Sequence, residues 1–502
     1  MQHLPFDNSY SRLPPRFFAR VQPDRAPDPH LIRLNHGLAA EIGLDPGWLE
    51  SAAGLAMLSG RDLPTEVESI AMAYAGHQFG GWVPQLGDGR ALLLGEVVGP
   101  DGIRRDIQLK GSGRTPFSRM GDGKAPLGPV LREYIVSEAM AALGVPTSRS
   151  LAAVATGETV YRERPLPGAV LARVAQSHVR VGTFQYFHAR NDRDGIRELA
   201  DYALERHFPG TGDTGTPYRR LLDEVIRRQA SLIARWMGLG FIHGVMNTDN
   251  MQIAGETIDY GPCAFMEAFH PGTVFSSIDH GGRYSWVNQP AIGEWNLARF
   301  AETLLPLLDA KDQESALAEA RGALSEFGVA FSAELSAVFR RKLGLDEGRD
   351  DDGIKQFIDS TFSVMATQKV DFTCFFRELT RVADRLIRDR SPVSHDLPDT
   401  FRELFADPSA ADSWFEGWRT HFAPESSSAP PRAVAMQRVN PVLIPRNHRV
   451  EEVIRGAATG NFETFHRLVD ALKSPYREQP GFSDLERPAR KDEVVHQTFC
   501  GT

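Results

Sequence analysis

The chain has 502 residues and a formal net charge of −9 at neutral pH. Its hydrophobic fraction of 42% and charged fraction of 24% are ordinary for a globular protein, and its length allows up to about three domains. The acidic balance does not favour a protein that binds mainly nucleic acid. The sequence has no run of about 18 apolar residues, so we expect no membrane-spanning helix.

Three cysteines, Cys263, Cys374 and Cys500, are spread along the chain. No two of them have the close spacing of a structural zinc site, and so few do not suggest a disulfide scaffold. The N-terminus shows no basic stretch followed by an apolar one, so we expect no signal peptide. A reducing compartment fits best, with the cytoplasm as the default and a monomer as the simplest oligomeric state.

Residues 1–65 are rich in proline and are predicted to be loop-like, with one short helical pattern near Leu38. Strands are predicted at Ala91–Val98 and Arg104–Lys110, and the turn residues 99–102 between them indicate a hairpin. A helix is predicted over Leu131–Leu143 from its apolar spacing. Three more short strands are predicted, at Leu151–Val154, Glu158–Tyr161 and Ala169–Val174.

The rest of the chain is predicted to be mainly helical, with patterns over 218–238, 294–308, 312–326, 353–366 and 375–389. An exposed loop is expected at 422–432 and an irregular tail after 473. This order predicts an α+β fold with a small β-rich lobe and a large helical lobe. We expect an N-terminal extension at 1–65, a β-rich N-lobe at 66–175, a helical C-lobe at 176–485 and a tail at 486–502.

The most informative segment is His243–Asn250 (HGVMNTDN), which Asp259–Gly261 (DYG) follows nine residues later. In protein kinases the catalytic loop has the sequence pattern H-R-D-x-x-x-x-N, and a metal-binding Asp-Phe-Gly lies further along the chain. The His and Asn keep this offset, but Val245 stands at the position of the kinase base and cannot accept a proton. Asp249 is the only nearby carboxylate left to act as a base. The order of lobes and motifs therefore predicts a bilobal protein-kinase-like fold without the usual base.

Two glycine-rich segments can bring backbone N–H groups close to phosphate. Gly87, Gly89 and Arg90 precede the first hairpin strand, although such a pattern more often marks only a turn. The loop Gly111–Lys124 combines three basic residues with four glycines, which suits a loop that wraps an anion. A solvated surface loop is the alternative. Kinases do not usually carry a second glycine-rich loop here.

Several charged side chains are candidates for holding a nucleotide. Lys110 ends the second hairpin strand, as the phosphate-pairing lysine of a kinase does. Glu133, expected in the first turn of the next helix, is the preferred partner of this lysine, with Glu138 as the alternative. Arg173 and Arg180 lie near the expected lobe boundary and could reach a phosphate. Taken alone, each of these residues has an ordinary structural explanation, as a solvated lysine, an acid that favours a helix dipole or a member of a surface ion pair. The prediction of a nucleotide site therefore depends on all of them occurring together in this order along the chain.

Asn250 and Asp259 are the candidate metal ligands. Mg²⁺ prefers oxygen ligands and completes its octahedron with phosphate oxygens and water. Two protein oxygens together with a triphosphate are therefore enough.

Together these residues resemble the selenoprotein O (YdiU) family of protein adenylyltransferases. The matching segments are Tyr74–Gly81, Gln85–Arg90, Leu109–Gly123, His243–Asn250, Asp259–Pro262, Asp279–Tyr284 and Arg438–Pro441. They are long and spread over nearly the whole chain. The resemblance implies a protein-kinase-like fold that binds ATP turned around, so that AMP passes to a Ser, Thr or Tyr hydroxyl of a protein substrate and pyrophosphate leaves.

The resemblance also implies residue roles. Asp249 would accept the proton, Glu133 would hold Lys110, and Asn250 and Asp259 would bind Mg²⁺ or Mn²⁺. The implied nucleotide contacts are Gly87, Gly89, Arg90, Lys110, Asp122, Gly123, Arg173, Arg180 and Asp259. Some animal members carry selenocysteine near the C-terminus, where this chain has Cys500. This thiol could form a regulatory disulfide, with Cys263 as one possible mate, or could stay idle.

Two other functions stay open on the sequence alone. The first is a true kinase that transfers the γ-phosphate of ATP, and both Val245 and the inserted glycine-rich loop count against it. The second is a non-catalytic scaffold that only binds nucleotide. Retention of Lys110, Glu133, Asn250 and Asp259 counts against a scaffold, because simple binding would not need the full phosphate and metal set.

Overall fold

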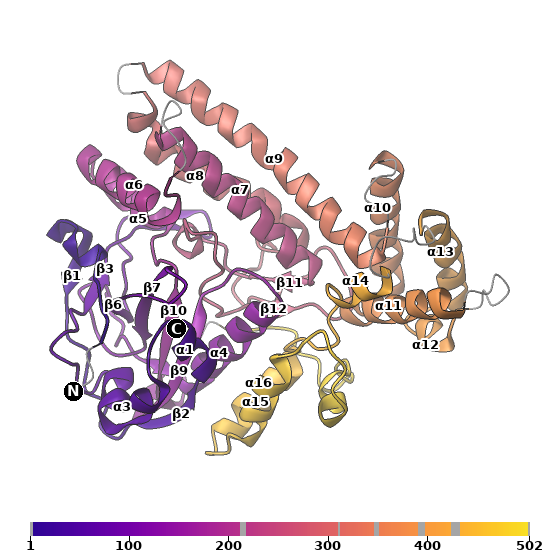
Figure 1. Cartoon of the computed structure of the whole chain (residues 1–502), viewed down its shortest axis with the longest axis horizontal. Helices are drawn as coiled ribbons and strands as arrows, with labels where there is room; N and C mark the ends of the chain where they lie inside the picture. The colour runs from indigo at the N-terminus through magenta and orange to yellow at the C-terminus, as the bar shows by residue number, and fades with distance from the viewer. Residues whose placement is uncertain are drawn as a thin grey trace.

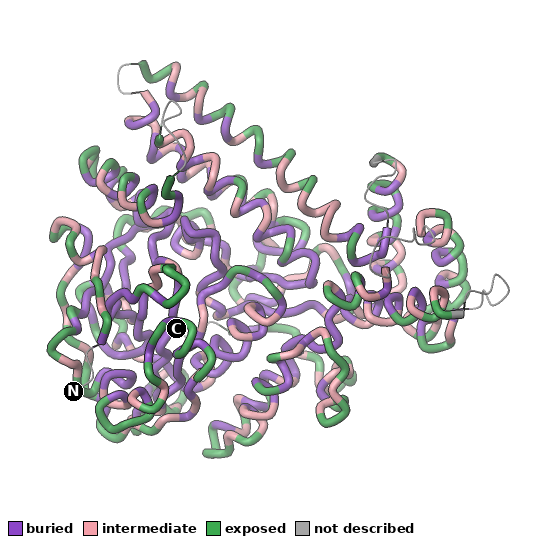
Figure 2. Tube along the Cα trace, viewed as in Figure 1, coloured by how far each residue is buried: buried purple, intermediate pink, exposed green. Residues whose placement is uncertain are grey.

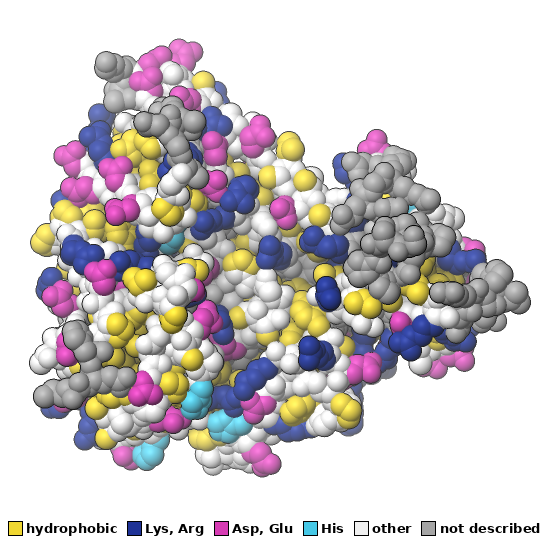
Figure 3. All heavy atoms as spheres, in the orientation of Figure 1, with side chains coloured by type: hydrophobic (Ala, Val, Ile, Leu, Met, Phe, Trp, Pro, Cys, Tyr) yellow, Lys and Arg dark blue, Asp and Glu magenta, His cyan; other side chains and the backbone are white. Residues whose placement is uncertain are grey.

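The computed structural model describes residues 4–210, 217–309, 312–345, 351–389, 397–422 and 432–499. A β-rich N-terminal lobe is followed by a larger helical lobe, which confirms the predicted α+β bilobal fold (Figure 1). Within these ranges no helix is both long and apolar enough to span a membrane. On the face shown in Figure 3, basic and acidic side chains are interspersed.

One antiparallel sheet forms the body of the N-terminal lobe, with strand order β1-β3-β6-β7-β10-β9-β2 and β8 paired to β10. The strands are β1 Phe18–Arg20, β2 His30–Leu34, β3 Ile70–Met72, β6 Ala91–Val98, β7 Arg104–Lys110, β8 Ala125–Pro126, β9 Arg149–Tyr161 and β10 Pro165–Ala175. Two small pairs lie outside it, β4 Gly76–Gln78 with β5 Gly81–Val83, and β11 Phe241–Ile242 with β12 Ala264–Phe265.

The predicted hairpin is confirmed as β6 and β7. The prediction of two short strands at 151–154 and 158–161 is wrong, because β9 runs through both. Gly157, between the two predicted strands, lies where the pairing of β9 with β10 is irregular. Its φ of +76° fits glycine at such a bulge. The continuous pairing with β10 on both sides of the bulge keeps the strand unbroken.

Residues 1–65 are more regular than their proline content predicts. Besides β1 and β2 they form the helices α1 His36–Glu41, α2 Pro46–Glu50 and α3 Ala52–Ser59. Side chains of Asn35, Asp45 and Ser51 cap these helices by accepting backbone N–H groups. Leu38, Leu49 and Met57 are fully buried against one face of the sheet. The short helical pattern predicted near Leu38 is confirmed as α1. The sequence pattern missed α2 and α3 because each is short and lacks a full apolar period.

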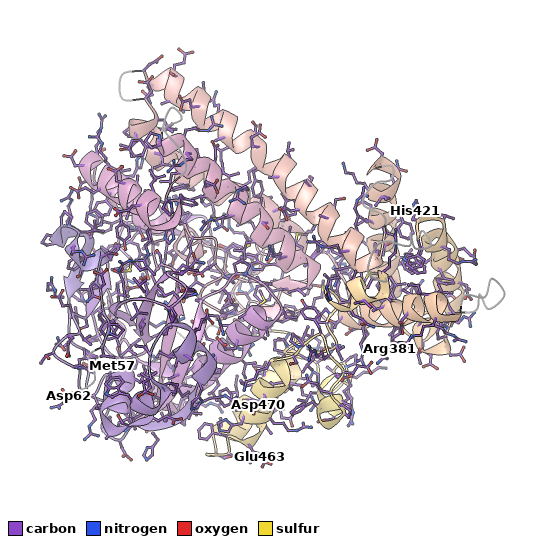
Figure 4. All side chains as sticks on the ribbon, in the orientation of Figure 1. Met57, Asp62, Arg381, His421, Glu463 and Asp470 are labelled. Carbon is purple, nitrogen blue, oxygen red and sulfur yellow. The ribbon has the colours of Figure 1, made fainter. Side chains whose placement is uncertain are left out.

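The other face of the sheet is covered by α4 Leu127–Ala142, behind which lie α15 Asn447–Ala457 and α16 Glu463–Leu472 (Figure 1). The helix begins four residues before the predicted start, because Pro129 is tolerated in a first turn whose N–H groups have no helical partner. Glu133 therefore lies in the second turn of α4, and the prediction of the first turn is wrong. Arg33 of β2 forms an ion pair with Asp470 of α16, which is labelled in Figure 4, and its Nη2 lies 2.5 Å from Oδ1 of the aspartate.

All five predicted helices of the larger lobe are present. Its helices are α5 Val181–His188, α6 Arg193–His207, α7 Pro217–Gly238, α8 Gln289–Leu308, α9 Gln313–Leu343, α10 Asp351–Gln368, α11 Phe372–Asp389, α12 Asp399–Arg402, α13 Pro408–His421 and α14 Arg432–Gln437. Short 3-10 helices lie at Tyr10–Arg12, Pro15–Phe17, Thr248–Asn250, Trp286–Asn288 and Pro480–Leu485.

Helix α9 is much longer than the predicted 312–326. It packs along α7 and α8, and much of its outer side is exposed (Figures 1 and 2). Its C-terminus ends at Gly344, which adopts the left-handed conformation at φ +66°. Most of the loop expected at 422–432 lies outside the described residues. The tail after 473 is irregular, as predicted, apart from the 3-10 helix at Pro480–Leu485.

Replacement of Phe465 should loosen the support behind α4. Phe465 is fully buried and its ring lies 5.5 Å from that of Tyr134 on α4. Phe465→Ala should lower the free energy of unfolding by about 3–5 kcal/mol through lost burial and a cavity. Chemical denaturation measures this, with the exposed Glu463 on the same helix (Figure 4) as control. Glu463→Gln should cost less than about 1 kcal/mol, and equal losses would contradict the packing argument.

Candidate active site

A cavity of about 840 Å³ lies between the sheet and the segment His243–Asn250. Every nucleotide, metal or proton-accepting residue predicted from the sequence lines it, namely Gly87, Gly89, Arg90, Lys110, Asp122, Gly123, Arg173, Arg180, Asp249, Asn250 and Asp259. Glu133 is the one predicted residue outside the lining, and it lies behind Lys110. Segments far apart in the sequence therefore meet around one space.

Three cations converge on the carboxylate of Asp259. Lys110 Nζ lies 2.7 Å from Oδ1, Arg173 Nη1 lies 2.8 Å from the same oxygen, and Arg180 Nη1 lies 2.9 Å from Oδ2. Burial raises the pKa of Asp259, but the lysine and the two arginines outweigh it and hold this pKa well below its usual range. The carboxylate is therefore ionised, and the three cations are held at fixed places around it.

Strand register explains why these cations meet. In the β7–β10 pairing Gln108 lies opposite Arg173, and Lys110 lies opposite Leu171. Side chains two residues apart share a sheet face, so Gln108, Lys110 and Arg173 project on the same side. Arg173 Nε donates to Gln108 Oε1 at 2.7 Å. Arg180 comes just before α5, and the face of its guanidinium packs on the Tyr74 ring at 4.7 Å.

Glu133 supports this arrangement from α4. Its carboxylate accepts Lys110 Nζ at 2.6 Å and Arg173 Nη1 at 3.1 Å. The alternative partner Glu138 faces away and binds Asn35 and Arg149 instead. The helix position of Glu133 therefore sets the place of two of the three cations.

Asp249 lies in the 3-10 helix Thr248–Asn250 at the edge of the cavity. Gln78 Nε2 donates to its Oδ2 at 3.3 Å, while its Oδ1 is buried without a hydrogen-bond partner. Burial raises the pKa of Asp249 to about 6. Arg180 also donates to the main-chain carbonyl of Asp249 at 2.6 Å, which ties this residue to the cation cluster. The side chain of Val245 lines the same cavity and offers no proton acceptor.

The two glycine-rich segments pack on each other. Gly87 has a φ of +72°, and a Cβ there would lie 2.2 Å from the Phe117 ring of the second segment. Gly113 N donates to the carbonyl of Gly123 at 3.1 Å, and a Cβ on Gly123 would lie 2.0 Å from the carbonyl oxygen of Gly113. Asp122 is held by Arg162 at 2.8 Å, so its carboxylate faces a cation. Glycine is required for this close backbone approach.

The sequence prediction missed several residues that shape the site. Gln78 donates a hydrogen bond to Asp249, and Arg162 donates to Asp122. The guanidinium of Arg180 packs on the ring of Tyr74. Asp88 is buried, accepts Gln108 Nε2 at 3.1 Å, and has a pKa raised to about 6 by burial. Asp88 lies within the first glycine-rich segment, but a single sequence marks these four residues only as turn or strand residues.

The donor atoms that face the cavity include oxygen atoms suited to a divalent cation. Across the described ranges no group of three or more His, Cys, Asp or Glu side chains is arranged to hold a metal alone. Asn250 and Asp259 line the cavity with oxygen atoms, and the Oδ1 atom of the neighbouring Asp249 has no hydrogen-bond partner. Oxygen donors suit Mg²⁺ and Mn²⁺, and substrate phosphates can complete the shell. The residues therefore fit such an ion.

The C-terminal tail runs beside the segment that follows Asp259. Thr498 donates through its hydroxyl to the carbonyl of Pro262 at 2.5 Å, and its backbone pairs with that of Ser276. Cys263 is buried and its thiol donates to the carbonyl of Tyr260 at 3.4 Å. Cys500 lies outside the described residues, so the expectation of a disulfide stays untested.

The substitution Gly123→Ala should weaken nucleotide binding more than the control substitution Gly102→Ala, at a glycine of similar φ. The added Cβ meets the carbonyl oxygen of Gly113 at 2.0 Å, which forces the two ends of the second glycine-rich segment apart. We expect the Kd for ATP to rise by about tenfold or more, since small misplacements of binding groups have large effects. Gly102 has a similar φ of +74° but open space around it, so Gly102→Ala adds strain without the clash. Calorimetric titration that gave equal Kd values for both variants would contradict this account.

Comparison with known proteins gives a consistent result. The model of a family described as protein adenylyltransferase SelO matches residues 1–473. Relatives called protein nucleotidyltransferase YdiU are 55% identical in Rhodopseudomonas palustris (strain BisB18), 56% in Methylorubrum populi and 53% in Rhizobium johnstonii. These alignments cover 100%, 99% and 99% of this chain and 99%, 99% and 97% of the relatives. The chain therefore belongs to the SelO family of protein nucleotidyltransferases, as its motifs predicted.

Proposed function

We propose that this enzyme transfers AMP from ATP to a hydroxyl side chain of a protein substrate and releases pyrophosphate. One observation carries the proposal: Lys110, Arg173 and Arg180 converge in the same cavity as the buried carboxylate of Asp249. Three cations suit the charge of a triphosphate, and a carboxylate beside them suits deprotonation of a hydroxyl. The description of the family and the names of the relatives favour nucleotidyl transfer.

The three cations would contact the phosphates of ATP. A phosphate group entering the cavity would share the three cations with Asp259, which contacts all three of them when no phosphate is bound. Because they are already placed by Glu133, Gln108 and Tyr74, little reorganisation is needed as charge develops on the α-phosphate and the leaving pyrophosphate. The backbone N–H groups of the two glycine-rich segments would add further donors.

Asn250 and Asp259 would hold Mg²⁺ or Mn²⁺. A divalent ion, when bound, neutralises phosphate charge and polarises the phosphoryl oxygens. The side-chain amide of Asn250 donates to the carbonyl of Val245 at 2.8 Å, which fixes its orientation in the cavity.

Asp249 would take the proton of the acceptor hydroxyl. The hydroxyl oxygen then bonds to the α-phosphorus, the bond to the oxygen that bridges the α- and β-phosphates breaks, and pyrophosphate leaves with that electron pair. Gln78 fixes one oxygen of Asp249 and leaves the other without a hydrogen bond, ready to accept a proton. A base at this position makes one at Val245 unnecessary.

Transfer of label from ATP tests the reaction. With ATP labelled on the α-phosphate, we expect label on the protein itself and on a mixed protein substrate, and none from the γ-phosphate. Lys110→Ala and Asp259→Ala should lower transfer by about 10²-fold or more, because each disrupts the phosphate-binding cluster. Label arriving only from the γ-phosphate would mean a kinase. No label from either position, with ATP still bound, would mean a scaffold.

Two glutamates on α4 provide a matched pair. Glu133→Gln should lower the rate of transfer by about tenfold or more, because two cations lose their support. Glu138→Gln, on the same helix, should keep the rate within about twofold, because its partners lie away from the cavity. Equal losses in the two variants would show that the rate depends only on the stability of α4.

A metal requirement follows from the oxygen donors. A chelator should abolish label transfer, and added Mg²⁺ or Mn²⁺ should restore it. Asn250→Ala should raise the metal concentration needed for half-maximal transfer by about tenfold or more. Binding of Mn²⁺ to the protein with a non-reactive ATP analogue, followed by electron paramagnetic resonance, should weaken in parallel. Unchanged Mn²⁺ binding in Asn250→Ala would remove this residue from the metal site.

A further inference from the structure

A strip of aromatic and cationic side chains lies outside the cavity, made of His77, Trp82, Arg283, Trp295 and Arg299. The Trp295 ring is flanked by two guanidinium groups, Arg283 at 5.0 Å and Arg299 at 5.1 Å. The His77 ring stands perpendicular to it at 5.2 Å and faces the Trp82 ring at 4.9 Å. The strip therefore joins the β4–β5 hairpin to α8 and to the loop before it.

The strip is joined directly to the proposed base. In the β4–β5 hairpin His77 pairs with Trp82, and the next residue, Gln78, donates to the carboxylate of Asp249. His77 N donates to the Thr248 hydroxyl at 2.7 Å. The hairpin is therefore fixed to the segment that carries Asp249. Gln78 faces this carboxylate, whereas His77 and Trp82 project from the opposite face of the hairpin, so a chain on the strip has to round the edge of the hairpin to reach Asp249.

The tip of the hairpin is anchored in the same way. Phe79 N donates to Asn247 Oδ1 at 3.0 Å, and the Tyr284 hydroxyl donates to the same oxygen at 2.6 Å. The Phe79 and Tyr284 rings pack edge to face at 5.1 Å. Since Tyr284 follows Arg283 in the chain, this contact also sets the place of that arginine beside the strip. The surface is therefore built on rigid contacts.

The charge of the strip is only partly balanced. Arg299 pairs with Glu302 at 2.6 Å. Arg283, by contrast, has no carboxylate within ion-pair distance among the described residues. The Nε atoms of both arginines are buried without a hydrogen-bond partner. At the other end of the strip Trp82 is 41% exposed, although it is a large apolar side chain. An uncompensated guanidinium and an exposed aromatic ring on one strip suit a ligand that brings a carboxylate and some apolar surface.

We propose that this strip binds an acidic segment of the protein substrate, next to the hydroxyl that receives the nucleotide. The inference rests on the proposed function and adds a substrate class to it. A carboxylate of the segment pairs with Arg283, the backbone and apolar atoms of the segment lie on Trp82 and Trp295, and its hydroxyl reaches Asp249. Opposite charge at the edge of the site selects among substrates.

Peptides that differ only in flanking charge test the proposal. Each carries one Ser, Thr or Tyr, flanked on both sides by Asp in one set and by the isosteric Asn in the other. We expect wild-type protein to use the Asp peptide about fivefold better in kcat/KM, mostly through KM, as partly exposed charge pairs allow. In Arg283→Ala the two peptides should become nearly equal, and in Arg283→Glu the preference should reverse. Raised salt should also shrink the wild-type preference.

Arg455→Ala is the matched control, since Arg455 is an exposed arginine on α15, away from α8 in Figure 1. It should keep the wild-type preference. The proposal is overturned if wild type uses both peptides equally, or if the preference survives in Arg283→Glu. A rise in the KM for ATP in Arg283→Ala, with the peptide preference unchanged, would also overturn it and assign the strip to the nucleotide.

A binding measurement separates this inference from the proposed function. Asp249→Asn protein, in which transfer is blocked, is titrated with each peptide while tryptophan fluorescence is followed. Tighter binding of the Asp peptide, lost when Arg283→Glu is added, supports the strip even if no label is ever transferred. Equal binding of both peptides overturns the strip, whatever the label experiment shows about AMP transfer.

Discussion

The site depends on one partly buried carboxylate, that of Asp259, which holds three cations. Without Asp259, the positive charges of Lys110, Arg173 and Arg180 would repel one another in a place with little water to screen them. Glu133 adds a second negative charge behind them. The cavity thus keeps its positive side chains close together before any phosphate is bound. The fold supports this cluster through two neighbouring strands, one helix and the loop that carries Asp259.

Much of this arrangement was predictable because it depends on order along the chain. Strand alternation placed Lys110 on one face of its strand, and the spacing of Asn250 and Asp259 matched a known catalytic pattern. Contacts between distant segments were not predictable in this way. Gln78 meets Asp249 across many residues of intervening chain, and Arg162 reaches Asp122 from the turn after β9. Neither residue has a local pattern that indicates its partner.

The errors in secondary structure have local causes. Two strands were predicted at 151–154 and 158–161, yet pairing with β10 on both sides of Gly157 carries one strand through a bulge. The start of α4 was placed too late because the apolar spacing behind the prediction begins at Leu131, whereas the helix also takes in Pro129, which is tolerated in a first turn. In both places the longer-range packing of the sheet outweighed the local preference.

The tail contacts have a consequence for how the molecule is made. Helix α4 is backed by residues 447–472, and Pro262 and Ser276 are joined by Thr498. Synthesis proceeds from the N-terminus, so the residues that line the cavity leave the ribosome long before those that secure them. A nascent chain can already contain all the proposed nucleotide contacts while two supports are still missing. These are residues 447–472, which back the helix that carries Glu133, and Thr498, which contacts the segment after Asp259. Full assembly of the site therefore waits for release of nearly the whole chain.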